Sequence, residues 1–183
     1  HKADYSAALP DLLKKVGSKL LAPKIQIYEG LEGVQNVFKD ILMYPDVDTY
    51  SFWPLKSMVG NLGADYWNWH NKERIKNNTK IYAIRSRTQN LSMKQAPYMG
   101  GGDLFKRWIR IAPDDVDFTM GYWIYANKIA LLSSSKERIG MIIESAEMVE
   151  MMKSKWQYIW KDSTPLEFDL KDCKPFLDYL KKP

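Results

Sequence analysis

The chain has 183 residues, 45% of them hydrophobic and 27% charged, and a formal net charge of +5. This length suits one well-packed domain and is short for two. No apolar run approaches the roughly 20 residues that span a bilayer, and no charged-then-apolar leader opens the chain, so we expect a cytoplasmic protein without a membrane partner.

Cysteine and histidine are scarce. Cys173 is the single cysteine, and His1 and His70 are the only histidines. One thiol forms no intrachain disulfide, and these three residues do not make a ligand set for zinc. Glycine motifs that cradle phosphates or dinucleotides are missing as well. The sequence therefore predicts no metal and no cofactor. Because the chain starts at His1 and not at methionine, we expect it to be a piece of a longer protein.

Residues 1–22 carry an apolar stripe at helical spacing. Its members are Leu9, Leu12, Leu13, Val16 and Leu20, and Pro10 falls in the first turn, where proline is tolerated. An isolated stripe of this kind needs a partner. Two interpretations fit: the helix packs on its own domain, or it is a linker through which two subunits dimerise.

Strands and helices alternate over the next 60 or so residues. Hydrophobic periodicity predicts strands at 24–28, 49–53 and 80–84 and helices at 31–42 and 62–77. The second helix is expected to bury the side that carries Leu62, Tyr66 and Trp69. Alternation of this kind predicts βαβ units with right-handed crossovers, in which neighbouring strands are parallel.

Residues 86–104 interrupt the alternation with a polar stretch that contains three consecutive glycines. Connections of this length are typical of a mobile segment or of a functional lid. In a lid, Gly100–Gly102 would be the hinge, and Lys94 and Tyr98 would be brought to a ligand.

The second half of the predicted domain is a run of strands closed by a helix. Apolar runs at 122–125, 128–132 and 138–143 are separated by turn-forming residues, as in successive strands of one sheet. The following helix should lie on that sheet through Val149, Met152, Trp156, Ile159 and Trp160. The predicted fold is α/β, with a mixed, largely parallel central sheet flanked by helices. In the tail, residues 162–183, we expect Phe176, Leu177 and Leu180 to dock on the domain.

Four segments resemble one protein family in their order along the chain. They are KIQIYEGLEGVQNVFKDIL at 24–42, ERIKNNTKIYAI at 73–84, the strands from IRIAP to IGMIIES, and the closing helix that ends in IW at 160. Together they resemble the carboxyl-terminal effector domain of the TrmB-like transcriptional regulators. The resemblance implies a phospholipase D-like topology for residues 23–161. It also implies a linker at 1–22 to a winged-helix DNA-binding domain outside this chain.

The resemblance allows a test for catalysis. Enzymes of the phospholipase D superfamily carry His-x-Lys on a strand and an Asp after four further residues; the His attacks phosphorus and the Lys binds phosphate oxygens. The equivalent positions here fall on Thr119, Gly121 and Ala126. None carries the reactive group, so the resemblance implies a domain that is not an enzyme.

His70 and Lys72, with Asn77 in place of the Asp, imitate the same motif. They fall in the predicted helix at 62–77, where side chains two positions apart point about 200° away from each other. We therefore expect them not to converge on one phosphate, and we expect His70 to be a surface or half-buried residue.

Ligands of open α/β sheets bind beyond the carboxyl ends of the strands. The candidate ligand-binding residues at those ends and around the missing catalytic groups are Tyr28, Glu29, Trp53, Arg85, Arg110, Thr119, Gly121 and Trp123. Aromatic faces beside a carboxylate and guanidinium groups suit a sugar, a nucleotide or a small anion. The alternative is that the aromatic residues belong to the core.

Three functions are consistent with the sequence. The first is the effector-sensing and dimerisation domain of a TrmB-like regulator, a homodimer that binds a small molecule without catalysis and reaches DNA through the absent domain. The second is a stand-alone nucleic-acid or phosphate-binding module, which would use the ten basic residues that lie among only two acidic ones between Lys72 and Arg110. The third is an active phosphodiesterase that depends on His70.

Overall fold

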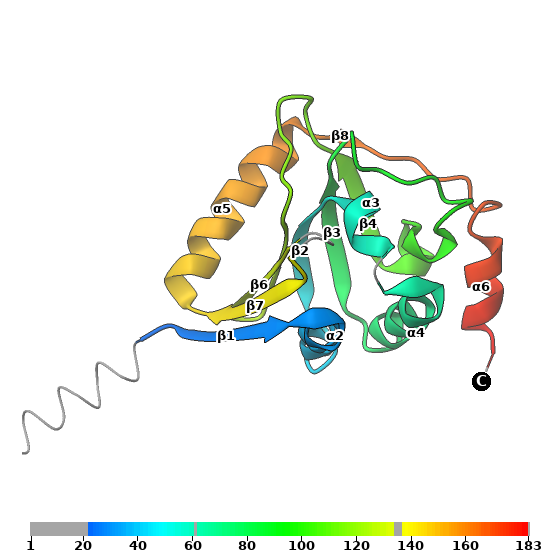
Figure 1. Ribbon diagram of the computed structural model, residues 1–183. Coiled ribbons are helices and arrows are strands. Elements are labelled where there is room, and N and C mark those ends of the chain that lie inside the picture. The colour runs from blue at the N-terminus through cyan, green and yellow to red at the C-terminus, as the bar shows by residue number, and fades with distance from the viewer. Residues whose placement is uncertain (1–21, 61, 134–136, 183) are drawn as a thin grey trace, which may run out of the picture.

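The computed structural model describes residues 22–60, 62–133 and 137–182. The predicted helix at 8–21 lies outside these ranges. The strands are β1 (Lys24–Glu29), β2 (Asp48–Trp53), β3 (Lys80–Arg85), β4 (Arg107–Ile111), β5 (Gly121–Tyr125), β6 (Lys128–Leu132), β7 (Ile139–Glu144) and β8 (Thr164–Pro165). They form one sheet in the order β1-β7-β6-β5-β2-β3-β4-β8 (Figure 1).

Five α-helices and two short 3₁₀ turns complete the described chain. They are α2 (Gly30–Ile41), α3 (Leu55–Val59), α4 (Gly63–Lys76), α5 (Ala146–Asp162), α6 (Lys174–Leu180), η1 (Pro97–Met99) and η2 (Asp103–Phe105). Every strand and helix predicted within the described ranges is present, with small shifts at the ends. No helix of the described chain combines the length and the apolar character needed to cross a membrane.

The mixed sheet flanked by helices is confirmed, but its predicted, largely parallel pairing is wrong. Among the described strands, only β2–β3 and β3–β4 pair in parallel, and the other five neighbouring pairs are antiparallel. β1 does not join β2; it crosses to the far edge and pairs with β7. β5 and β6 are joined by a two-residue turn, a connection that only antiparallel strands allow.

The sheet has two buried faces because successive side chains of a strand point to opposite sides. Trp53 and Trp123 point to the face that carries α2 and α4, whereas Phe52 and Tyr122 point to the face under α5. Figure 1 shows α5 alone on one side and α2, α4 and α6 on the other. The first of these faces is the one that contains the candidate site.

Part of the segment 86–104 packs into the core, which neither sequence-based interpretation anticipated. Tyr98 and Met99 are buried. At Gly100 a Cβ atom would lie 2.6 Å from the Phe105 ring, so glycine is required here by close packing and not as a hinge. The docking predicted for the tail is confirmed at Phe176, which is 1% exposed in the same core cluster.

Trp156 is the buried residue through which helix α5 lies on the sheet. Trp156 is 3% exposed, and its Nε1–H donates to the Ser51 carbonyl over 3.0 Å. Tyr158, two residues further on, is 74% exposed. The two aromatic side chains therefore form a matched pair for measuring how strongly this contact stabilises the fold.

We expect Trp156→Ala to lower the free energy of unfolding by about 3–5 kcal/mol, because it removes a large buried side chain and leaves a cavity. Tyr158→Ala should change it by less than about 0.5 kcal/mol. Urea unfolding followed by circular dichroism measures both. Equal losses in the two variants would contradict the described packing of α5.

Candidate functional site

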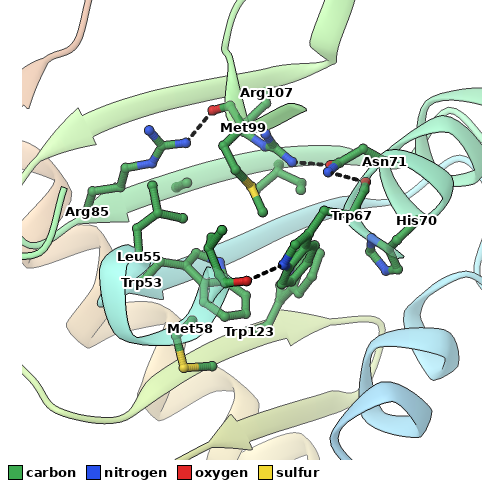
Figure 2. A pocket seen from close by; sticks show the side chains of 13 residues that line it. Trp53, Leu55, Met58, Trp67, His70, Asn71, Arg85, Met99, Arg107 and Trp123 are labelled. Atoms are coloured by element: carbon green, nitrogen blue, oxygen red, sulfur yellow. Dashed lines mark hydrogen bonds between the residues drawn. The ribbon is translucent and has the colours of Figure 1, made fainter. Parts of the chain in front are cut away.

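An internal cavity of about 30 Å³ lies between the sheet and the helices of the α2 and α4 face. This is room for one or two water molecules. Neighbouring strands β5, β2, β3 and β4 each contribute side chains to its wall, and α4 closes it (Figure 2). The lining residues are Trp53, Leu55, Met58, Val59, Trp67, His70, Asn71, Ile81, Ala83, Arg85, Met99, Arg107 and Trp123.

His70 is buried, which corrects the expectation of a surface or half-buried residue. It is 1% exposed and packs edge-on against Phe38 and Trp123, with ring centroids 5.7 and 6.1 Å away. Its Nε2 lies 3.0 Å from the Phe38 carbonyl. Because a carbonyl only accepts hydrogen bonds, Nε2 carries the proton, and Nδ1 is left as an acceptor without a partner. Burial lowers the pKa of His70 to about 3.

Lys72 points away from His70, as predicted. Its ammonium donates to the Lys182 carbonyl over 2.7 Å and lies 5.5 Å from the centroid of the Tyr179 ring. The two side chains of the apparent His-x-Lys motif therefore occupy the core and the surface. They do not form a joint phosphate site.

The buried face of α4 was also mispredicted in part. Trp67, His70, Asn71 and Arg74 are its buried residues, and Trp69 is 38% exposed. Positions 67, 70, 71 and 74 have helical spacing and were visible in the sequence. Three of these four residues are polar, however, so a search for apolar residues at helical spacing did not identify them as the buried face.

Two buried arginines of the cavity wall bind consecutive carbonyls of one turn. Arg85 donates to the Met99 carbonyl over 2.5 Å, and Arg107 donates to those of Tyr98 and Gly100 over 3.2 and 3.1 Å. Arg107 also bonds the side-chain oxygen of Asn71 on α4 (Figure 2). The turn at 98–100 is thereby fixed against strands β3 and β4.

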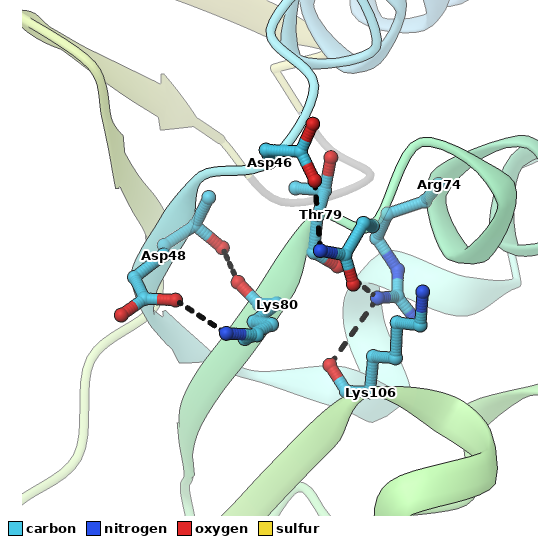
Figure 3. A network of polar contacts seen from close by, with 8 residues as sticks. Asp46, Asp48, Arg74, Thr79, Lys80 and Lys106 are labelled. Carbon is cyan, nitrogen blue, oxygen red and sulfur yellow. Dashed lines mark hydrogen bonds and ion pairs between the residues drawn. The ribbon is translucent and has the colours of Figure 1, made fainter.

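A third arginine, Arg74, repeats this arrangement at the end of α4. Its guanidinium donates to the Thr79 carbonyl over 2.6 Å and to that of Lys106 over 3.3 Å (Figure 3). It also donates to the Phe105 carbonyl over 2.6 Å. Its Nε–H has no partner. Arg74 thus ties α4 to the starts of β3 and β4.

The interior around these arginines is positively charged. Arg74 and Arg85 are fully buried and Arg107 is 5% exposed, yet none of them forms an ion pair with a described residue. Burial lowers the pKa of all three groups, that of Arg107 to about 10, and repulsion by Arg107 lowers those of Arg74 and Arg85 further. These three guanidiniums belong to the ten basic residues between Lys72 and Arg110, so that cluster presents less charge to a nucleic acid than the sequence suggests.

The structure brings four of the eight predicted ligand residues together. Trp53, Arg85 and Trp123 line the cavity. Gly121 lies beside them: a Cβ atom there would be 3.2 Å from Cε3 of Trp53. The Trp53 indole therefore packs against Gly121, where an open hollow was expected.

The other four predicted residues lie elsewhere. Tyr28 lines a separate polar pocket beside Asp40, and Glu29 is exposed at the end of β1. Thr119 is exposed in a groove against α5. Arg110 lies 4.7 Å above the Trp160 ring. The polar cavity residues other than tryptophan that sequence reasoning missed are His70, Asn71 and Arg107. Arg107 opens a strand, and no local pattern marks it as buried.

Acidic and metal-binding groups do not gather near the cavity. Within the described ranges, no group of three or more His, Cys, Asp or Glu side chains is placed to hold a metal ion. The polar groups of the cavity wall are guanidiniums, an amide, an indole N–H and a neutral imidazole. This set is suited to binding a small polar or anionic molecule.

The sheet order and the helices on both faces define a phospholipase D-like fold. TrmBL2, an archaeal chromatin protein, is similar with a TM-score of 0.57 and 12% identity, over 90% of this chain and 63% of its own. Nuc from Salmonella typhimurium, a phospholipase D family member, is similar with a TM-score of 0.58 and 10% identity, over 80% of this chain and all of its own. NucT from Helicobacter pylori is similar with a TM-score of 0.55 and 8% identity, over 79% of this chain and all of its own.

Comparisons of the sequence do not assign the chain to a protein family. No family model matches the chain, and no curated protein sequence matches it. At about a tenth of identical residues, the structural likeness establishes the fold alone. The chain spans 63% of the length of the TrmBL2 chain, so the DNA binding of TrmBL2 is a property of a larger protein.

The contribution of an indole hydrogen bond to stability can be measured by comparing Trp67 with Trp123. Trp123 Nε1–H has no partner, whereas Trp67 Nε1–H donates to the Val59 carbonyl over 3.1 Å. Tryptophan to phenylalanine removes similar volume at both sites. In buffer that contains no small anion, we expect Trp67→Phe to lower the free energy of unfolding by about 1–2 kcal/mol more than Trp123→Phe, because only Trp67 then loses a hydrogen bond. Denaturant unfolding measures the difference, and equal effects would contradict it.

Burial of neutral His70 makes stability depend on pH. The pKa of His70 is about 3 in the folded chain and about 6.5 when unfolded, so the unfolded state binds the extra proton first. Stability is complete above pH 6.5 and falls as the pH drops towards 3. We expect a loss of about 2 kcal/mol between pH 7 and pH 5.

His70→Gln is the control for this pH dependence, because glutamine does not titrate. Over the same interval its free energy of unfolding should stay nearly constant, since most carboxylates titrate below pH 5. A slope that survives in the variant would show that another group is responsible.

Proposed function

We propose that this chain is a non-catalytic, ligand-binding domain of a TrmB-like transcriptional regulator. The observation that carries the proposal concerns the positions where enzymes of this fold hold their reactive groups. Thr119 is exposed and has no imidazole partner, and Gly121 has no side chain at all. A side chain at 121 would begin in tight contact with the Trp53 indole, 3.2 Å from its Cε3. These positions supply neither a nucleophile toward phosphorus nor a cation for phosphate oxygens.

Ligand binding is proposed for the adjacent cavity. A buried polar atom without a partner costs free energy, and the cavity wall contains two of them, Nδ1 of His70 and Nε1 of Trp123. A polar occupant that pairs with both would stabilise the folded chain. A sugar is larger than 30 Å³ and would bind only with displacement of the wall, whereas a small anion fits the cavity as it stands.

The regulatory part of the proposal is supported by the likeness to TrmBL2, which extends over 90% of this chain. We propose that the chain acts as a homodimer, that residues 1–22 link it to a DNA-binding domain, and that the ligand favours one arrangement of the two subunits. The alternative, a stand-alone nucleic-acid-binding module, is less well supported, since Arg74, Arg85 and Arg107 are buried.

A ligand screen together with an activity assay tests the proposed function. Sugars, nucleotides and small anions are added one at a time, and the melting temperature of the 183-residue chain is measured. At least one compound should raise it, because a ligand that binds only the folded state stabilises that state. Hydrolysis of bis(4-nitrophenyl) phosphate should equal the rate without protein.

Two results would contradict the proposal. Phosphodiester turnover that is abolished in His70→Ala would indicate an enzyme. Salt-sensitive binding of this chain alone to DNA would favour the nucleic-acid-binding alternative, because the proposed function places DNA contacts in another domain.

A further inference from the structure

We infer that the internal cavity is a binding site for one small monovalent anion, of the size of chloride or nitrate, held by Arg85 and Arg107. This inference rests on the proposed ligand site and narrows its ligand class. It comes from the charge of the wall, the size of the cavity and its unpaired N–H group.

The charge of the wall is uncompensated. Arg85 and Arg107 are 2% and 5% exposed, and all the hydrogen bonds that they donate go to neutral oxygen atoms, those of backbone carbonyls and of the Asn71 and Asn90 amides. Removing a charge from water costs several kcal/mol unless an opposite charge is near. No described carboxylate lies within ion-pair distance of either guanidinium. A bound anion would supply the missing countercharge.

Neighbouring titratable groups do not supply it. Cys173 is buried near both arginines, but burial raises the pKa of its thiol, so the thiol stays neutral at pH 7. His70 is neutral as well and contributes no charge. A bound ion is therefore the remaining source of a countercharge.

Cavity size selects the kind of anion. A volume of about 30 Å³ admits one or two particles of the size of water. Chloride and nitrate fall in this range, whereas a sugar phosphate or a nucleotide does not. The anion class is thus monovalent and small.

The unpaired atoms of the wall agree with an anion and one water molecule. Trp123 offers a free indole N–H, a donor that suits an anion. Nδ1 of His70 is an acceptor, which would repel an anion but accepts a hydrogen bond from water.

The test is a thermal titration in buffer whose only anion is gluconate, which is too large for the cavity. Chloride, bromide or nitrate replaces gluconate at constant ionic strength. We expect the melting temperature to rise by about 3–6 °C at ten times the dissociation constant. Arg85→Met should abolish the rise and Trp123→Phe should reduce the apparent affinity several-fold. Arg87→Met alters an exposed arginine two residues from Arg85 and should leave the rise in melting temperature unchanged.

A bromide-soaked crystal gives a readout that does not depend on Arg85→Met being able to fold. An anomalous peak between the guanidiniums of Arg85 and Arg107 is expected. Equal melting temperatures in all four anions together with no bromide peak would overturn the inference.

The same titration separates this inference from the proposed function. If halides have no effect but a metabolite raises the melting temperature, the anion site is wrong and the ligand-binding function stands. If halides bind and no metabolite acts, the anion site stands as a structural one, and the effector-sensing function is wrong.

Discussion

The arrangement on which the rest of this structure depends is the binding of backbone carbonyls by buried guanidinium groups. Residues 86–106 cross the domain with little regular secondary structure, so many of their carbonyls lack the partners that a helix or a sheet would supply. Arg85 and Arg107 bind the carbonyls of residues 98–100, and Arg74 binds those of 105 and 106. A guanidinium has five N–H donors in a fixed plane, which makes it suitable for several acceptors at once. This irregular segment can therefore lie in the core.

The same arrangement determines the character of the candidate site. Carbonyls satisfy the hydrogen bonds of the guanidiniums but do not neutralise their charge. The cavity beside them consequently has a wall that is positive in an otherwise apolar surrounding, where electrostatic interactions are strong. Trp53 packs against Gly121 on β5, where a Cβ atom would lie 3.2 Å from its ring. The positive charge of this face comes from β3 and β4.

Much of the fold could be predicted because its strands and its α5 helix have clear periodicity. Strands β5 to β7 and the contact of Trp156 follow directly from alternating and helical spacing. The pairing of β1 with β7 could not be predicted in this way, since sequence order does not show which edge a strand joins. The anticipated ligand residues Trp53, Arg85 and Trp123 do meet, because neighbouring strands bring their ends together.

The parts that sequence reasoning missed share one physical cause. They contain buried polar side chains whose hydrogen-bond partners are backbone carbonyls. Hydrophobic periodicity treats His70, Asn71 and Arg74 as the outer side of α4, whereas each has a backbone carbonyl as its partner in the core. The fold brings Phe38 to His70 and Phe105 to Arg74, whereas Asn71 bonds the Trp67 carbonyl one turn earlier on α4. Polar side chains of this kind are indistinguishable from surface residues in the sequence.

Helix α4 connects the cavity to the packed segment. It carries His70 and Asn71 at the cavity wall and Arg74 one turn later at the carbonyls of 105 and 106. Asn71 also bonds Arg107, the residue proposed to hold the anion. An occupant that draws Arg107 towards the cavity would therefore act on α4 and on the turn at 98–100 together. Helix α6 lies against both α4 and η1, so the effect would extend to the carboxyl-terminal segment. In the proposed regulator, the ligand would be linked to the surface of the domain by the hydrogen bonds of Arg107 to α4 and to the turn, and by the packing of α6 against both.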